Sequence, residues 1–160
     1  MMYAPALTSL PQETSALTGC ALSPRPDEAR KARSFTRDTL ATWDLADLAD
    51  DAVVIVGELL ANAVQHAGTC LPAPGMTAPD MTAPDMTAQD ACLGLWLLRH
   101  PQGLMCVVTD LSDRPPALRQ PGDTAEGGRG LHVIHSLSDH WGWTPLGGQG
   151  KAVWALLFRD

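Results

Sequence analysis

The sequence predicts an α+β fold, a two-layer sandwich in which helices cover one face of a sheet. Two helical segments come first, between residues 27 and 67, and an apolar hairpin follows at residues 91–110. A short helix then precedes a second hairpin, which ends near residue 158. This order of elements favours a two-layer α+β architecture. A chain of 160 residues is long enough for about one domain with its own core.

The N-terminal part is expected to contain a strand and a helix. Residues 1–15 lack hydrophobic periodicity and are expected to be a flexible N-terminus, so the domain is placed at residues 16–160. Residues 16–22 fit a short strand at the edge of the sheet. A helix opens near Pro26, because proline is favoured in a first helical turn, and it runs to about Trp43.

A second helix, from about Leu48 to Ala67, carries the most informative side chains. Glu58, Asn62 and His66 are spaced i, i+4, i+8, so they line one side of this helix. The surrounding positions are apolar, so the acid and the amide interrupt a helix that otherwise has the pattern of a buried one. A buried carboxylate needs a cation, a hydrogen-bond partner or a wet cavity, and a magnesium-nucleotide site supplies all three. Taken alone, the same residues also fit an exposed acid, a satisfied amide and a helix-end histidine.

Residues 69–90 are predicted to be a low-complexity loop insertion. Met-Thr-Ala-Pro-Asp occurs at 76–80 and again at 81–85, and Met-Thr-Ala-Gln-Asp follows at 86–90. The recurring prolines forbid a regular helix, and short tandem repeats bury little surface. We therefore expect an extended, exposed loop here.

The second half of the chain is expected to be mainly strands. The expected strands lie at 91–98, 104–110, 140–144 and 151–158, with turns at 99–103 and 147–150, a loop at 111–126 and a helix at 130–137.

A glycine cluster, Gly127-Gly128-Arg129-Gly130, lies where the loop leads into this last helix. Glycines permit close backbone approach, and the free amides of a helix N-terminus attract phosphate oxygens. The cluster matches neither the dinucleotide fingerprint nor a P-loop, and Gly150-Lys151 is not a P-loop either, because alanine follows it. By itself the cluster also fits a flexible turn.

Taken together, these motifs resemble the GHKL family of ATPases and kinases. The resemblance is carried by Glu58-x-x-x-Asn62-Ala63-x-x-His66, by Asp110 at the end of an apolar strand, and by Gly128-x-Gly130-Leu131 opening a helix. It spans roughly residues 20–158 and is closest to the small anti-sigma factor serine/threonine kinase branch. It implies the Bergerat, or histidine-kinase-like ATPase, fold: a mixed, mostly antiparallel sheet covered by helices on one face, with nucleotide between helix and sheet.

The resemblance also implies a role for each matching residue. Asn62 would coordinate Mg²⁺ at the ATP phosphates, Glu58 would be the catalytic general base, and Asp110 would accept a hydrogen bond from the adenine amino group. The backbone around Gly130 would hold phosphates. The residues implied to contact ATP or its metal are Asn62, His66, Asp110, Gly128, Arg129, Gly130 and Leu131.

The segment after Asp110 departs from the family pattern. The family's Asp-x-Gly-x-Gly box is here Asp110-Leu111-Ser112-Asp113-Arg114, so both glycines are missing. The backbone beside the adenine site is therefore expected to be less flexible. ATP affinity and turnover are questions separate from the fold, because they depend on this segment.

Composition excludes several classes of function. The net charge is −7, and basic residues gather only at 25–37, which argues against a phosphate-tracking nucleic-acid surface. No apolar run reaches the roughly 18 residues of a membrane span, and no secretory signal is present, so we expect a cytoplasmic location. The four cysteines indicate neither a zinc site nor a disulfide framework, and Cys92 and Cys106 are expected to be core thiols.

Three functions remain open at this point. The first is an ATP-dependent serine/threonine kinase that binds a sigma factor and phosphorylates an antagonist protein. The second is a non-catalytic module whose nucleotide only sets the shape offered to a partner. The third is an interaction scaffold that has lost nucleotide binding. The resemblance also makes a homodimer plausible.

Overall fold

The computed structural model describes residues 16–25, 27–66, 92–112, 114–116, 130–147 and 150–160. The expected N-terminal flexibility at 1–15 and the loop insertion at 69–90 lie outside these residues. The elements are β1 (Ala16–Leu22), α1 (Glu28–Thr42), the 3₁₀ turn η2 (Ala46–Leu48), α2 (Ala49–His66), β2 (Leu93–His100), β3 (Gly103–Asp110), α3 (Gly130–Leu137), β4 (His140–Pro145) and β5 (Lys151–Phe158).

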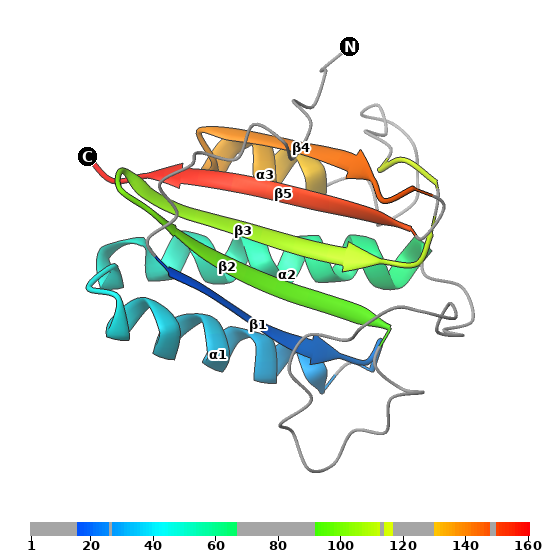
Figure 1. Ribbon diagram of the computed structural model, residues 1–160, viewed down its shortest axis with the longest axis horizontal. Helices are drawn as coiled ribbons and strands as arrows, with labels where there is room; N and C mark the ends of the chain where they lie inside the picture. The colour runs from blue at the N-terminus through cyan, green and yellow to red at the C-terminus, as the bar shows by residue number, and fades with distance from the viewer. Residues whose placement is uncertain (1–15, 26, 67–91, 113, 117–129, 148–149) are drawn as a thin grey trace.

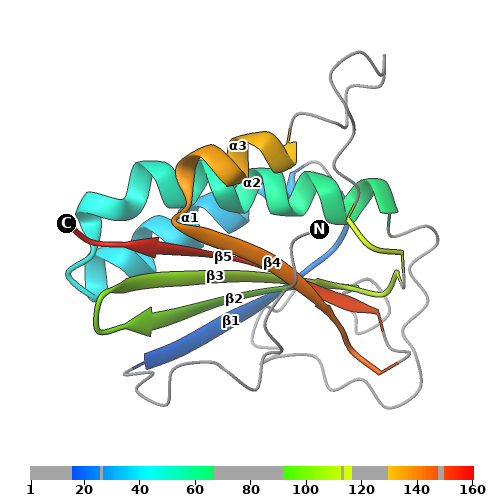
Figure 2. The same ribbon diagram turned by 90° about the horizontal axis from the view of Figure 1, so that it is seen from above.

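The strands form one sheet in the order β1-β2-β3-β5-β4 (Figure 1). All four pairings are antiparallel, so the described part of the sheet contains no parallel pair. The three α-helices lie together on one face of the sheet (Figure 2). The predicted two-layer α+β sandwich is therefore confirmed.

The main core lies between the helices and the sheet. Alternate strand residues point to opposite faces, and on β3 Leu104, Cys106 and Val108 point into this core. On α2, Ile55 and Leu59 are fully buried, so the helix side that carries Glu58 also contributes to the core. Contacts among these buried side chains fix the position of α2 relative to β3.

The helix-free face of the sheet is also apolar. Met105 and Val107 of β3 and Ala152 and Trp154 of β5 form a second cluster of buried side chains there. An antiparallel sheet with one open face normally carries polar residues on it, so this face is unusually apolar.

The connection between α1 and α2 is a helix cap followed by a short turn. Asp44 follows the helix in the left-handed region, with φ 59°. The amide of Leu45 donates to the carbonyl of Leu40 at 2.8 Å, and the amide of Asp44 donates to that of Ala41 at 3.3 Å, which is a Schellman ending. The connection therefore consists of this cap followed by the 3₁₀ turn η2.

The first hairpin turn is shorter than predicted. β2 continues to His100 and β3 begins at Gly103, so only Pro101 and Gln102 lie between the strands. Hydrogen bonding between β2 and β3 extends each strand toward the turn. Local sequence composition does not reveal this pairing.

The cysteines differ in part from expectation. Cys106 is a buried free thiol, as predicted, and Cys20 is also free. The expectation of a core thiol is wrong for Cys92, which is disulfide-bonded. Among the helices of the described chain, none is long and apolar enough to cross a membrane.

Candidate functional site

Helix α2 presents Glu58 and Asn62 on the side that faces α3. Asp50 and Asp51 lie in its first turn, where negative charge suits the helix dipole. Because Ile55 and Leu59 are buried beside them, Glu58 and Asn62 are held at the border of the core, and both are partly exposed. Helix α2 contacts both α3 and β3.

Glu58 lies directly against the first residue of α3. A Cβ atom built on Gly130 would be 2.8 Å from Glu58 Oε2. The absence of a side chain at Gly130 is therefore what allows the carboxylate to reach the N-terminal end of α3. The two motifs that the sequence singled out, about 70 residues apart, share one place in the fold.

Asn62 lies one turn after Glu58. Its Nδ2 atom is shielded from solvent and has no hydrogen-bond partner. An unsatisfied buried amide costs roughly 1–3 kcal/mol, and such atoms in native folds call for a ligand or another explanation.

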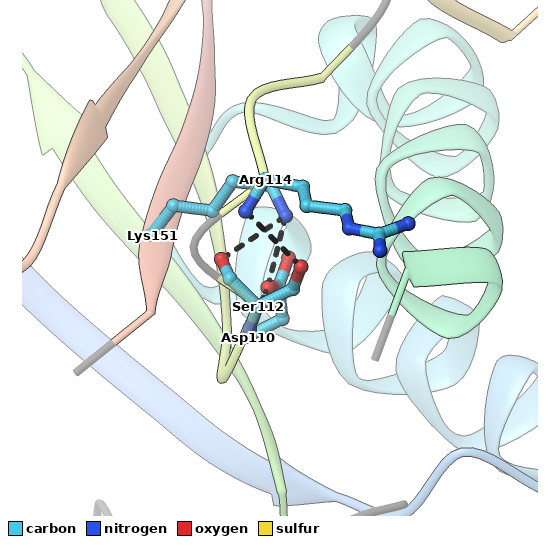
Figure 3. A network of polar contacts seen from close by, with 4 residues as sticks. All are labelled: Asp110, Ser112, Arg114 and Lys151. Atoms are coloured by element: carbon cyan, nitrogen blue, oxygen red, sulfur yellow. Dashed lines mark hydrogen bonds and ion pairs between the residues drawn. The ribbon is translucent and has the colours of Figure 1, made fainter. Parts of the chain in front are cut away.

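Asp110 ends β3 and is buried, with 1% of its surface exposed. Its Oδ1 accepts a hydrogen bond from the Ser112 amide at 2.8 Å and from Lys151 Nζ at 3.0 Å (Figure 3). Its Oδ2 is shielded from solvent and has no partner. The side chain of Arg114, which is exposed, extends away from this cluster (Figure 3).

Sequence reasoning missed Lys151. The sequence rules out a P-loop at Gly150-Lys151 and indicates only a likeness of residues 150–154 to the anti-sigma kinase branch, with no role for the lysine, whereas the structure buries Lys151 completely beside Asp110. The available signal was a lone lysine that opens an otherwise apolar strand, Lys-Ala-Val-Trp-Ala-Leu-Leu-Phe. Such a charge must find a buried partner or lie outside the strand.

The remaining predicted residues are placed only in part. Leu131 is buried, with 2% exposure, and its side chain belongs to the main core, so it is not free to contact a phosphate. His66 is the last residue of α2, but its side chain lies outside the described part of the chain. Gly128 and Arg129 also lie outside it.

The residues present fit a magnesium nucleotide. Asn62 Nδ2 and Asp110 Oδ2 are two of the four buried side-chain atoms without a hydrogen-bond partner in the described residues, and the Glu58 carboxylate lies at the helix N-terminus that begins with Gly130. Amide and carboxylate oxygens are the ligands that Mg²⁺ prefers, and a free carboxylate oxygen can accept a hydrogen bond from an amino group.

A separate apolar hollow of about 420 Å³ lies on the other flank of α2. Leu22, Leu60, Val64 and Gln65 are among its lining residues, and none of the candidate site residues lines it. This hollow is therefore distinct from the candidate site.

Comparison with known proteins finds a match to one family model. The family model of the histidine kinase-like ATPase domain matches residues 22–156. No curated protein matches the chain in sequence at a significant level. The matched range includes every element from α1 to β4 and most of β5.

Proposed function

Because the chain belongs to the histidine kinase-like ATPase family, we propose that it binds Mg-ATP beside α2 and acts as a regulatory protein kinase of the anti-sigma type. Family membership implies ATP binding, commonly with Mg²⁺. The observation that carries the proposal is the contact of Glu58 with Gly130, next to the unpartnered amide of Asn62.

Asn62 is the proposed magnesium ligand. Its side-chain oxygen is a hard ligand of the kind that Mg²⁺ selects, and its unpartnered Nδ2 group is a donor that suits a phosphate oxygen. A bound Mg²⁺ supplies positive charge that offsets the phosphates and the nearby carboxylate.

Glu58 is the proposed general base. Its carboxylate is held at the N-terminal end of α3, where the helix amides also favour anions. In this position it would take the proton from the serine hydroxyl of a partner protein. The proposed partners are a sigma factor and an antagonist protein that receives the phosphate, and the kinase is proposed to act in the cytoplasm as a homodimer.

Calorimetric titration with Mg-ATP tests nucleotide binding. We expect saturable binding by the wild type and a loss of at least about tenfold in affinity for Asn62→Ala, the scale of one hydrogen bond or ligand to a charged group. Gln65→Ala is the matched control, because Gln65 is exposed on the same helix but lines the separate hollow. Equal affinities for both variants and the wild type would contradict the role of Asn62.

Transfer from labelled ATP to candidate antagonist proteins tests catalysis. Wild-type protein should label a serine of the antagonist, and Glu58→Gln should abolish labelling while retaining Mg-ATP binding. If Glu58→Gln labels the antagonist at the wild-type rate, Glu58 is not the general base.

The segment after Asp110 favours a second candidate, a nucleotide sensor without turnover. Ser112 and Arg114 occupy the positions where the family box has glycines, which restricts the backbone beside the base. Under this alternative Mg-ATP binds without transfer or hydrolysis. A titration that is silent with both ATP and ADP would refute both candidates and leave an interaction scaffold.

A further inference from the structure

A buried ion pair joins the ends of β3 and β5. Asp110 and Lys151 are paired in the sheet register, and Lys151 Nζ lies 3.0 Å from Asp110 Oδ1. Neither side chain is exposed to solvent. Removing two charges from water is costly, so such a pair persists only where each charge is held by well-placed partners.

The two carboxylate oxygens of Asp110 are not equivalent. Oδ1 receives both the Lys151 ammonium and the Ser112 amide, whereas Oδ2 receives nothing. Lys151 also approaches the Ser112 carbonyl at 3.5 Å. The ammonium therefore holds the carboxylate against the turn that follows it and leaves a single oxygen without a partner.

Gly150 makes this approach possible. It has φ +99°, and a Cβ atom at this position would lie 1.8 Å from the carbonyl oxygen of Asp110. Only a glycine lets the start of β5 come so close to the end of β3.

Side-chain hydrogen bonds order the segment after Asp110, where the family box has glycines. The Asp110 carboxylate accepts from the Ser112 amide, and the Ser112 hydroxyl accepts from the Arg114 amide at 3.2 Å, so two side-chain turns follow one another. Lys151 fastens the first of these turns from the neighbouring strand. Hydrogen bonds and an ion pair therefore restrict this segment, whereas glycines would make it flexible.

We propose that Lys151 is a positioning residue that occupies one oxygen of Asp110 and thereby sets the preference of the site for 6-aminopurine over 6-oxopurine nucleotides. This proposal rests on the nucleotide binding proposed above. A carboxylate with two free oxygens can accept both neighbouring N–H donors of a guanine edge. With Oδ1 occupied, the remaining oxygen matches the single amino group of adenine.

Titrations with Mg-ATP and Mg-GTP test the proposal on wild type, Lys151→Met and Lys151→Gln. The wild type should prefer ATP by at least about tenfold, the scale of one hydrogen bond to a charged group. Lys151→Met should lower that ratio at least fivefold. Lys151→Gln, whose amide can still donate to Oδ1, should keep the ratio within about twofold of the wild type and provides a second variant if the methionine form folds poorly.

The control is Lys31→Met, the same change at a half-exposed lysine on α1. A purely structural role for Lys151 would weaken ATP and GTP binding equally, so an unchanged ratio in Lys151→Met would overturn the proposal. A wild-type ratio near one would overturn it as well.

Amide hydrogen exchange at Ser112, measured without nucleotide, separates this proposal from the proposed function. Exchange should accelerate at least about tenfold in Lys151→Met and stay unchanged in Lys31→Met, because the acceptor of the Ser112 amide loses its anchor. Unchanged exchange in Lys151→Met would refute the positioning role itself. A wild-type chain that bound neither nucleotide would instead refute the proposed function.

Discussion

The contact between Glu58 and Gly130 can be tested with a single methyl group. In Gly130→Ala the new Cβ would lie 2.8 Å from Glu58 Oε2, whereas ordinary contact begins at 3.4 Å, so the carboxylate must move by roughly 0.6 Å. Because the obstructing atom ends a flexible side chain, this movement costs about 0.5–1.5 kcal/mol. Alanine gains about 0.5–1 kcal/mol over glycine within a helix, so we expect little net change in the free energy of unfolding.

The functional effect should be much larger than the stability effect. A displaced Glu58 and a methyl group at the start of α3 both disturb the place where phosphates are proposed to bind, and losing one hydrogen bond to a charged group costs roughly 1.5–3 kcal/mol, or about tenfold or more in affinity. We expect Mg-ATP affinity to fall about tenfold in Gly130→Ala, as measured by calorimetry, while thermal unfolding shifts by no more than about 4 °C.

Gly57→Ala is the matched control. It is the same substitution on α2, next to Glu58, and a Cβ atom at Gly57 would meet nothing within 4 Å. It should raise the melting temperature by about 1–4 °C and leave Mg-ATP affinity within about twofold. If the two variants bind nucleotide equally well, the contact between Glu58 and Gly130 has no part in the site and the reasoning fails.

Three further predictions concern stability, each measured by urea unfolding. Gly150→Ala should cost about 2–5 kcal/mol, because its φ is +99° and its Cβ would collide with a backbone carbonyl, whereas Gly147→Ala, at φ +61° with open space around it, should cost about 1–2 kcal/mol; equal losses would contradict this. Asp44→Gly should stabilise the chain by about 0.5 kcal/mol, because Asp44 has φ 59° at a helix end, and a loss of stability would show that its side chain matters more. Burial raises the pKa of Cys106 from 9.0 to about 12, so above pH 9 the unfolded thiol loses its proton while the folded one keeps it. Stability should therefore fall by up to about 1.4 kcal/mol per pH unit between pH 9 and 12, and Cys106→Ala should lessen that slope; an identical slope in the variant would contradict the assignment.

Much of the fold could be predicted because local sequence signals and tertiary packing agree. The α2 helix, the glycine at the start of α3 and both hairpins carry strong periodicity or turn residues, and the expected bounds differ from the observed ones by a few residues. The hairpin turn is narrower than the sequence predicts, because pairing between β2 and β3 continues to His100 and Gly103.

The polar arrangement at Asp110 could not be predicted in the same way. Its lysine partner is 41 residues away in sequence, and only the pairing of β3 with β5 brings the two together. The second apolar cluster, around Trp154, likewise depends on which strand face lacks helices. Sheet order decides both, and no local pattern encodes sheet order.

The closed surroundings of Asp110 bear on the speed of ligand uptake. Water does not reach its Oδ2 atom in this conformation, so a purine cannot meet that oxygen in a single diffusive collision. Capture must include a rearrangement step, and the observed association rate should level off as nucleotide concentration rises. Release of the proposed nucleotide should be slow for the same reason, because the rearrangement must also precede its departure.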